Sequence, residues 1–182
     1  MLHNIFTLII DTIAGILAGV LLLRFWMQTA RVRGPSSVSQ FVFQLTDWLV
    51  RPLRRVIPGV GGIDWATLLA AFLVVLLASV LKAAVGGYFA IGLVLVLALQ
   101  TMLTWMIYGL IALLILGAVF SWINPHAPLA PFVGALTDPL LRPLRRVIPM
   151  AGPIDLTPLV AIVLLQIALY LVRHLGVALL TF

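Results

Sequence analysis

The sequence predicts an all-α membrane protein with four transmembrane helices arranged as two tandem parallel repeats. The chain of 182 residues is 64% hydrophobic and 9% charged, and its mean hydropathy is +1.25. It therefore has too few polar groups to cover a soluble surface. Residues 46–65 (TDWLVRPLRRVIPGVGGIDW) and 137–156 (TDPLLRPLRRVIPMAGPIDL) lie 91 positions apart and agree at 14 of 20 positions. This internal repeat indicates that one structural unit occurs twice.

The first repeat, residues 1–87, contains two predicted spans at about 5–27 and 65–82. The first span carries a single internal charge, Asp11, and ends in Arg24-Phe25-Trp26, a basic and aromatic sequence suited to the headgroup boundary. The second span begins after Asp64 and ends at Lys82. Between them, apolar residues recur at helical spacing and predict an amphipathic helix in the membrane plane, with Ser36 or Ser37 as its cap: Val38, Phe41, Val42, Leu45 and Leu49.

The second repeat, residues 88–182, contains predicted spans at about 101–123 and 156–173. Residues 88–123 carry no charge and would reach about 54 Å as one helix, too long for a single crossing. We therefore expect a re-entrant or interfacial segment at 88–100, following a break at Gly86-Gly87. The last span lies between Asp155 and Arg173, which repeats the arrangement of Asp64 and Lys82.

Charge distribution predicts the orientation of these spans. The formal net charge is +6 and the pI about 11.2; in a membrane protein, an excess of Lys and Arg is typical of cytoplasmic loops. We expect a multi-pass protein of the plasma (inner) membrane, with both basic repeat segments cytoplasmic and both termini outside. Nucleic acid is not an expected partner, because the aromatic residues lie in apolar runs away from the arginines.

The repeated arginines are the candidate binding residues: Arg51, Arg54, Arg55, Arg142, Arg145 and Arg146. Guanidinium groups at headgroup depth can bind phosphate in a bidentate manner, which favours an anionic lipid site or a docking surface for an acidic partner. The alternative is that they set topology and pair internally, Asp47 with Arg51 and Asp138 with Arg142. Prolines limit any helix that follows the amphipathic segment to about one turn: Pro52, Pro58, Pro143 and Pro149.

Three further features each leave two interpretations open. Asp64 and Asp155 precede a span, where they can cap the helix or form a paired proton or cation site. Asp11 is an intramembrane functional candidate or a residue at the outer headgroups near His3. The pair Gly15 and Gly19 favours either internal helix packing or dimerisation.

The sequence lacks catalytic and cofactor motifs. The histidines His3, His126 and His174 show no metal-ligand spacing, and the absence of cysteine excludes disulfides and thiolate ligands. We expect no enzyme activity, no cofactor and no metal.

The chain resembles the YggT family of small bacterial integral membrane proteins, which includes the YlmG proteins of cyanobacteria and plastids. The resemblance covers nearly the whole chain, and its motifs are LLLRFWMQ at 21–28, SQFVFQLTDWLVRPLRRVIP at 39–58, GGID at 61–64, and SWINP with TDPLLRPLRRVIP in the second half. Arg24 departs from the symmetry, because residues 120–122 stand opposite it without a basic side chain.

The family resemblance implies roles connected with osmotic tolerance, cell division and the maturation of a membrane cytochrome complex, but no catalytic residues. Two hypotheses follow from it. The first is a scaffold or assembly factor that uses the arginine segments to bind anionic lipid headgroups or a membrane-protein partner. The alternative is an ion or osmotic channel or transporter, which would require several copies of this four-span chain to form a pore.

Overall fold

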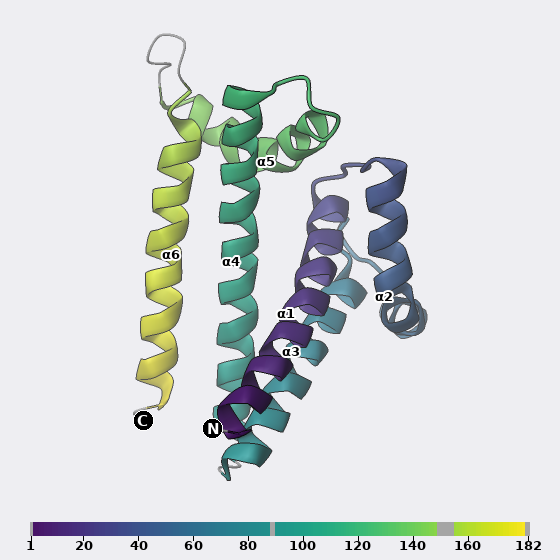
Figure 1. Ribbon diagram of the computed structural model, residues 1–182, viewed down its shortest axis with the longest axis vertical. Coiled ribbons are helices and arrows are strands. Elements are labelled where there is room, and N and C mark those ends of the chain that lie inside the picture. The colour runs from purple at the N-terminus through teal and green to yellow at the C-terminus, as the bar shows by residue number, and fades with distance from the viewer. Residues whose placement is uncertain (1, 88–89, 149–154, 181–182) are drawn as a thin grey trace.

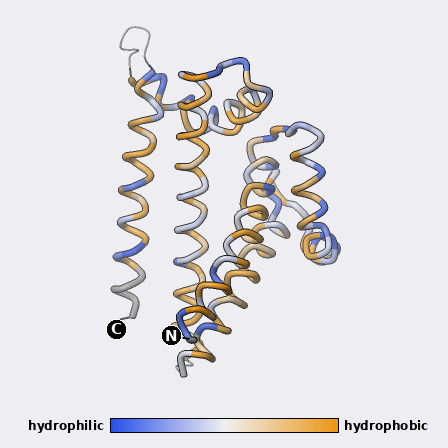
Figure 2. Tube along the Cα trace, in the orientation of Figure 1, coloured by the Kyte–Doolittle hydropathy of each residue, from blue (hydrophilic) through white to orange (hydrophobic). Residues whose placement is uncertain are grey.

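The computed structural model describes residues 2–87, 90–148 and 155–180, and within them the chain forms six helices. They are α1 (Leu2–Thr29), α2 (Ser36–Val56), α3 (Trp65–Gly86), α4 (Ile91–Ile123), α5 (Ala130–Arg145) and α6 (Thr157–Leu180). Four of them, α1, α3, α4 and α6, are long and apolar enough to cross a membrane, and they are mostly hydrophobic along their length in Figure 2. The prediction of a multi-pass, all-α protein with four spans is thus confirmed.

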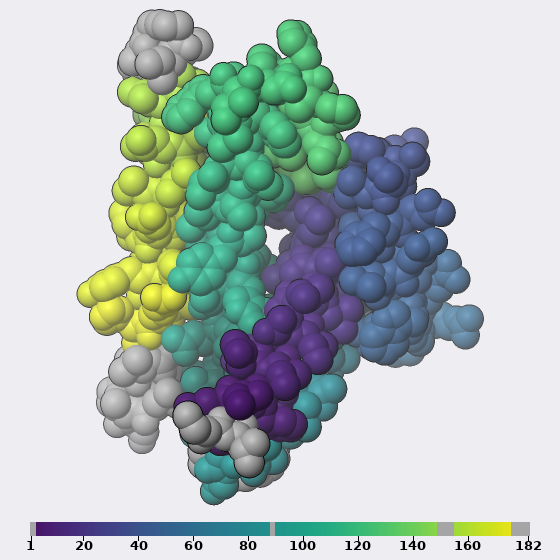
Figure 3. All heavy atoms as spheres, viewed as in Figure 1, coloured from purple at the N-terminus to yellow at the C-terminus, as the bar shows by residue number. Residues whose placement is uncertain are grey.

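The two halves of the chain lie side by side, each with two long helices and one short amphipathic helix (Figure 1). The short helix α2 packs against α1 and α3 and forms the flank of the molecule away from α6 (Figure 3). Its counterpart α5 lies across the ends of α4 and α6. The first residues of α1 and the last described residues of α6 lie at the same end of the molecule (Figure 1), as four crossings require.

The third span begins ten residues earlier than the predicted 101. Residues 91–100, expected to form a re-entrant or interfacial segment, are the first turns of the continuous helix α4. The prediction failed because the 33 residues of α4 contain no proline, and a helix of about 50 Å can extend beyond a hydrocarbon layer of about 30 Å at both ends. Residues 88 and 89 lie outside the described ranges. The expected break is present at Gly87, whose left-handed backbone (φ 71°) caps α3.

The short helices differ from expectation at both of their ends. Pro35 is the N-cap residue of α2, with no side-chain cap bond, so the prediction of a Ser36 or Ser37 cap was wrong; both serines are already inside the helix. Pro52 is likewise inside α2, which continues to Val56, and α5 contains Pro143 in the same way. Each proline removes one hydrogen-bond donor, and the helices continue because their apolar residues, Val50 in α2 and Leu141 in α5, are packed in the cores.

The cores of the two halves use equivalent residues. In the first half Leu21, Val50 and Ala70 are buried together, and in the second half Leu114, Leu141 and Ala161 are. An offset of 91 positions relates the two halves in the short helix and in the helix that follows it, as the sequence repeat indicates. Residues of α1 and α4 correspond at an offset of 93 (21 and 114). This correspondence identifies the partner of each functional side chain in the other half.

Small residues of α1 pack inside the molecule. Ala18 is fully buried against Val75 of α3 and Ala98 of α4, and a Cβ built on Gly15 would lie 3.9 Å from the Trp105 ring. Space is open beside Gly19, where no atom lies within 4 Å of a Cβ. The contacts therefore favour internal packing for Ala18 and Gly15.

The four-crossing topology can be tested by single-cysteine labelling, because the chain has no native cysteine. Cysteines at Ser37 and His126, which are exposed near the ends of α1 and α4, should react with an impermeant maleimide from the same side of sealed membrane vesicles. A cysteine at Asn4, exposed near the start of α1, should react only from the other side. Labelling of His126→Cys and Ser37→Cys from opposite sides would contradict a single crossing by α4.

Candidate functional site

An arginine near the end of each short helix forms an ion pair with the aspartate that precedes the following span. In the first half Arg54 forms an ion pair with Asp64, whose side chain also accepts hydrogen bonds from the backbone N–H (3.2 Å) and the hydroxyl of Thr67. Asp64 is thus the N-cap of α3, as predicted. The buried Thr67 was not predicted; a hydroxyl three residues after a capping aspartate is the signal that could have found it.

The second half repeats this arrangement, and in both halves the arginine and the aspartate are ten residues apart in the chain. Arg145 Nη2 lies 3.0 Å from Asp155 Oδ2, and Asp155 Oδ1 accepts a hydrogen bond from the backbone N–H of Thr157 at 2.9 Å and another from its hydroxyl. Arg145 also lies 3.5 Å from Asp138. Each aspartate is therefore bonded to an arginine and a threonine of its own half, which is the geometry of a helix cap.

These contacts stabilise the ionised form of both aspartates. Burial acts to raise the pKa of Asp64, but the hydrogen bonds from Arg54 and Thr67 outweigh it and hold that pKa below its ordinary value. Burial likewise opposes ionisation of Asp155, and the hydrogen bonds from Thr157 and Arg145 hold its pKa below the ordinary value. Both carboxylates are charged at neutral pH.

A tight turn positions Asp64 after the proline that ends the arginine segment. Gly61 and Gly62 have φ angles of 67° and 81°, and the backbone N–H of Ile63 donates to the carbonyl of Val60 at 3.2 Å. Two successive left-handed residues favour glycine, which explains the GG of the first copy. Pro58 lies two residues before this turn; its counterpart Pro149 lies outside the described residues.

A second aspartate in the first half holds a buried arginine. Arg24 of α1 is only 3% exposed, and its Nη1 donates to Asp47 Oδ1 at 2.8 Å and to the buried Thr46 hydroxyl at 2.6 Å. Its guanidinium carbon also lies 4.8 Å from the centre of the Phe43 ring. Burial acts to raise the pKa of Asp47, but the bond and charge of Arg24 hold it below its ordinary value. The sequence drew attention to Arg24 but did not reveal this pairing.

The residue equivalent to Arg24 in the second half is Gly117, 93 positions later, and not one of residues 120–122. A Cβ on Gly117 would lie 3.8 Å from Thr137, the counterpart of Thr46. In the first half, the Arg24 side chain occupies the space beside the short helix. At the equivalent place, the second half has a largely apolar groove of about 1300 Å³ between α4, α5 and α6. Asp138, Arg145 and Asp155 line it.

The remaining arginines of the repeated motif point outward. Arg51 and Arg142 pair with the aspartate four residues earlier, at 2.7 Å (Asp47) and 2.5 Å (Asp138), but 76% and 70% of their side chains stay exposed. Arg55 and Arg146 are exposed and form no ion pair with any residue that the structure describes. The six arginines thus divide into a pair bound to the aspartates before the next span, Arg54 and Arg145, and an outward set of four.

Asp11 lies far from the arginine segments, at the other end of the molecule. Its Oδ1 accepts a hydrogen bond from Lys82 Nζ at 2.7 Å. Among the described residues, no group of three His, Cys, Asp or Glu side chains could hold a metal ion.

A model of the family described as CCB3/YggT matches the chain twice, over residues 3–85 and 96–176. The chain belongs to the CCB3/YggT family. It is 34% identical over 169 residues to the "Uncharacterized protein YggT" of Escherichia coli, covering 90% of this chain and 87% of that protein. It is also 35% identical over 159 residues to an "Uncharacterized protein" of Haemophilus influenzae, covering 87% and 86%. No solved structure matches the chain. The two YggT matches correspond to the two halves of the fold.

Removing the carboxylate of Asp47 should destabilise the protein more than removing its repeat counterpart. Asp47→Asn leaves the buried Arg24 guanidinium without a carboxylate, and we expect a loss of about 3 kcal/mol in the free energy of unfolding. Asp138→Asn breaks only exposed pairs and should cost less than about 1 kcal/mol. Denaturant unfolding of the purified protein in detergent measures both values. Equal losses would show that Arg24 does not depend on Asp47.

The helix cap at Asp64 should be separable from its ion pair. Asp64→Ala removes both and should cost about 1 to 2 kcal/mol, whereas Asp64→Asn keeps a capping side chain and should cost less. Because the folded pKa of Asp64 is lowered, its contribution is complete above about pH 4 and is lost as the pH falls through the folded value. Thermal unfolding between pH 3 and 7 should show this loss in the wild type but a weaker one in Asp64→Asn.

Proposed function

We propose that this YggT protein is a non-catalytic scaffold or assembly factor of the plasma (inner) membrane. In this role its two arginine segments bind anionic headgroups or the acidic face of a membrane-protein partner. The observation that carries the proposal is the division of the six arginines. Arg54 and Arg145 are occupied by the helix caps, while the four outward arginines form two matched basic surfaces.

The internal pairs give these surfaces a fixed position. The Arg54–Asp64 and Arg145–Asp155 ion pairs attach the end of each short helix to the start of the next span. Arg55 and Arg146 directly follow the paired arginines in the chain, so they are held close to the start of a span, where the proposal expects lipid headgroups. Guanidinium groups suit this position because they bind phosphate or carboxylate through two parallel hydrogen bonds.

Membrane orientation follows from the same residues. Both basic surfaces belong to the connections between consecutive spans of one repeat, and so share one side of the membrane. An excess of Arg in such short connections favours the cytoplasmic side, with the termini outside. A negatively charged inner leaflet would attract these residues.

The decisive variant removes the two unpaired cations together, Arg55→Gln with Arg146→Gln. Photo-crosslinking in native membranes, followed by mass spectrometry, should recover specific partner proteins or lipids with the wild type and lose them with this double variant. The fold should be preserved, because neither side chain is used by a cap. Crosslinks that persist unchanged would contradict the proposal.

A charge-matched control is Arg31→Gln with Arg33→Gln, which removes two cations from the connection between α1 and α2. This control should keep the crosslinked partners if the repeated surfaces are specific, and lose them if only overall charge matters. Ion efflux from liposomes containing the purified protein, abolished by Arg55→Gln with Arg146→Gln, would instead support an oligomeric channel.

A further inference from the structure

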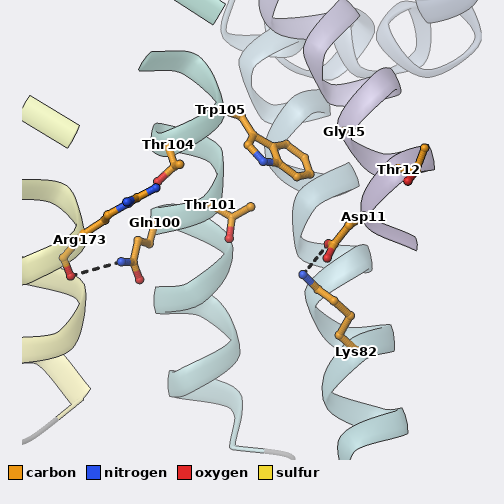
Figure 4. A pocket seen from close by; sticks show the side chains of 9 residues that line it. All are labelled: Asp11, Thr12, Gly15, Lys82, Gln100, Thr101, Thr104, Trp105 and Arg173. Carbon is orange, nitrogen blue, oxygen red and sulfur yellow. Dashed lines mark hydrogen bonds and ion pairs between the residues drawn. The ribbon is translucent and has the colours of Figure 1, made fainter. Parts of the chain in front are cut away.

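A second charged cluster lies at the end of the molecule opposite the arginine segments. It lines a groove of about 540 Å³ formed by α1, α3, α4 and α6, with Asp11, Lys82, Gln100, Thr101, Thr104 and Arg173 among its lining residues (Figure 4). Both halves of the chain contribute to it. None of the outward arginines of the repeated motif takes part.

Among its described lining residues, the groove contains a cation at the equivalent position of both halves, Lys82 and Arg173, but a carboxylate in the first half alone. Lys82 and Arg173 are repeat equivalents, 91 positions apart, and Asp11 corresponds to Thr104 at the offset of 93 that relates α1 to α4. In the first half Asp11 neutralises Lys82 at 2.7 Å. In the second half Arg173 extends toward α4 beside Thr104 (Figure 4), so a hydroxyl stands where the first half has a carboxylate.

Arg173 consequently has neutral neighbours. Its Nη2 donates to the Tyr108 hydroxyl at 2.6 Å, and its guanidinium carbon lies 5.9 Å from the centre of that ring. No carboxylate of the described chain forms an ion pair with it. The groove therefore carries one net positive charge, together with hydroxyl and amide groups from Thr101, Thr104 and Gln100 that can donate hydrogen bonds.

The depth of the groove is that of the boundary between headgroups and hydrocarbon. Lys82 lies four residues before the end of α3, about 6 Å along the axis, and Gln100 lies nine residues after the start of α4, about 13 Å. A centred helix of 33 residues extends about 10 Å beyond a hydrocarbon layer of about 30 Å on each side. A cation at this depth can reach the headgroups, and an anionic headgroup gives it the ion pair that the described chain itself does not supply.

We propose that this groove binds the phosphodiester group of an anionic phospholipid from the leaflet at the end where the termini lie. A phosphodiester carries one negative charge, which matches the single uncompensated cation, and its oxygens accept hydrogen bonds from a guanidinium and from hydroxyl groups. This site is independent of the proposed scaffold function, since it uses different residues at the other end of the molecule.

Repeat symmetry supplies the test. Thr104→Asp gives the second half the carboxylate of the first and neutralises Arg173, and it should weaken binding of phosphatidylglycerol roughly tenfold. Asp11→Asn removes the carboxylate that pairs with Lys82 and should strengthen binding. Native mass spectrometry of the full chain, titrated with phosphatidylglycerol, measures both changes. Performing the titration in the Arg55→Gln with Arg146→Gln background removes lipid binding at the opposite end.

Three results would overturn this proposal. The first is wild-type affinity in a Thr104→Asp protein whose thermal unfolding is unchanged, and the second is weaker binding by Asp11→Asn. The third concerns the source of the phosphate. If inorganic phosphate binds in an Arg173-dependent manner while phosphatidylglycerol does not, a lipid is not the ligand. Thr104→Ser serves as a matched control and should bind like the wild type, because it keeps the hydroxyl.

Discussion

The structure of each half depends on one ion pair between the short amphipathic helix and the aspartate that begins the second span. Arg54–Asp64 and Arg145–Asp155 join the end of each short helix to the start of the next span, and the apolar contacts of Val50 with Ala70 and of Leu141 with Ala161 hold the same helices together. The same carboxylates accept hydrogen bonds at the start of a helix, where backbone N–H groups have no partner within the helix. A single side chain thus fixes the direction of the span and the position of the basic surface, which explains why the arginine and the aspartate occur together in both copies.

Duplication does not require the two copies to keep the same polar residues. Three central positions of their apolar cores are equivalent, because close packing restricts the shape of each side chain. The polar residues of α1 and α4 have diverged: Arg24 corresponds to Gly117 and Asp11 to Thr104. Each difference removes one charged partner from the second half. The first half is internally neutralised at these points, and the second half is left with a groove at one end and an unpaired cation at the other.

Much of this could be predicted from the sequence, and the exceptions have physical causes. Hydropathy identified the four spans, and a capping role was one of the two interpretations of the aspartates at 64 and 155, because a carboxylate before a helix has a local role. The start of α4 was misplaced because a helix without proline can be longer than the bilayer is thick, and only three-dimensional context decides whether it continues. The pairs Arg24–Asp47 and Lys82–Asp11 join residues 23 and 71 positions apart, and no local pattern signals such contacts. The proline rule failed because a proline removes one hydrogen bond from a helix, and the apolar contacts of neighbouring residues such as Val50 and Leu141 still hold α2 and α5 in place.

The glycine at position 117 makes the two halves differ in how their interiors respond to the surrounding solvent. The first half fills the space beside its amphipathic helix with its own Arg24 side chain, so its packing is set by the chain alone. The second half leaves a largely apolar groove of about 1300 Å³ at the same place, and the walls of an empty groove forfeit dispersion contacts. The packing of α4, α5 and α6 therefore leaves apolar surface uncovered at a place where the first half has already made its contacts with its own side chain.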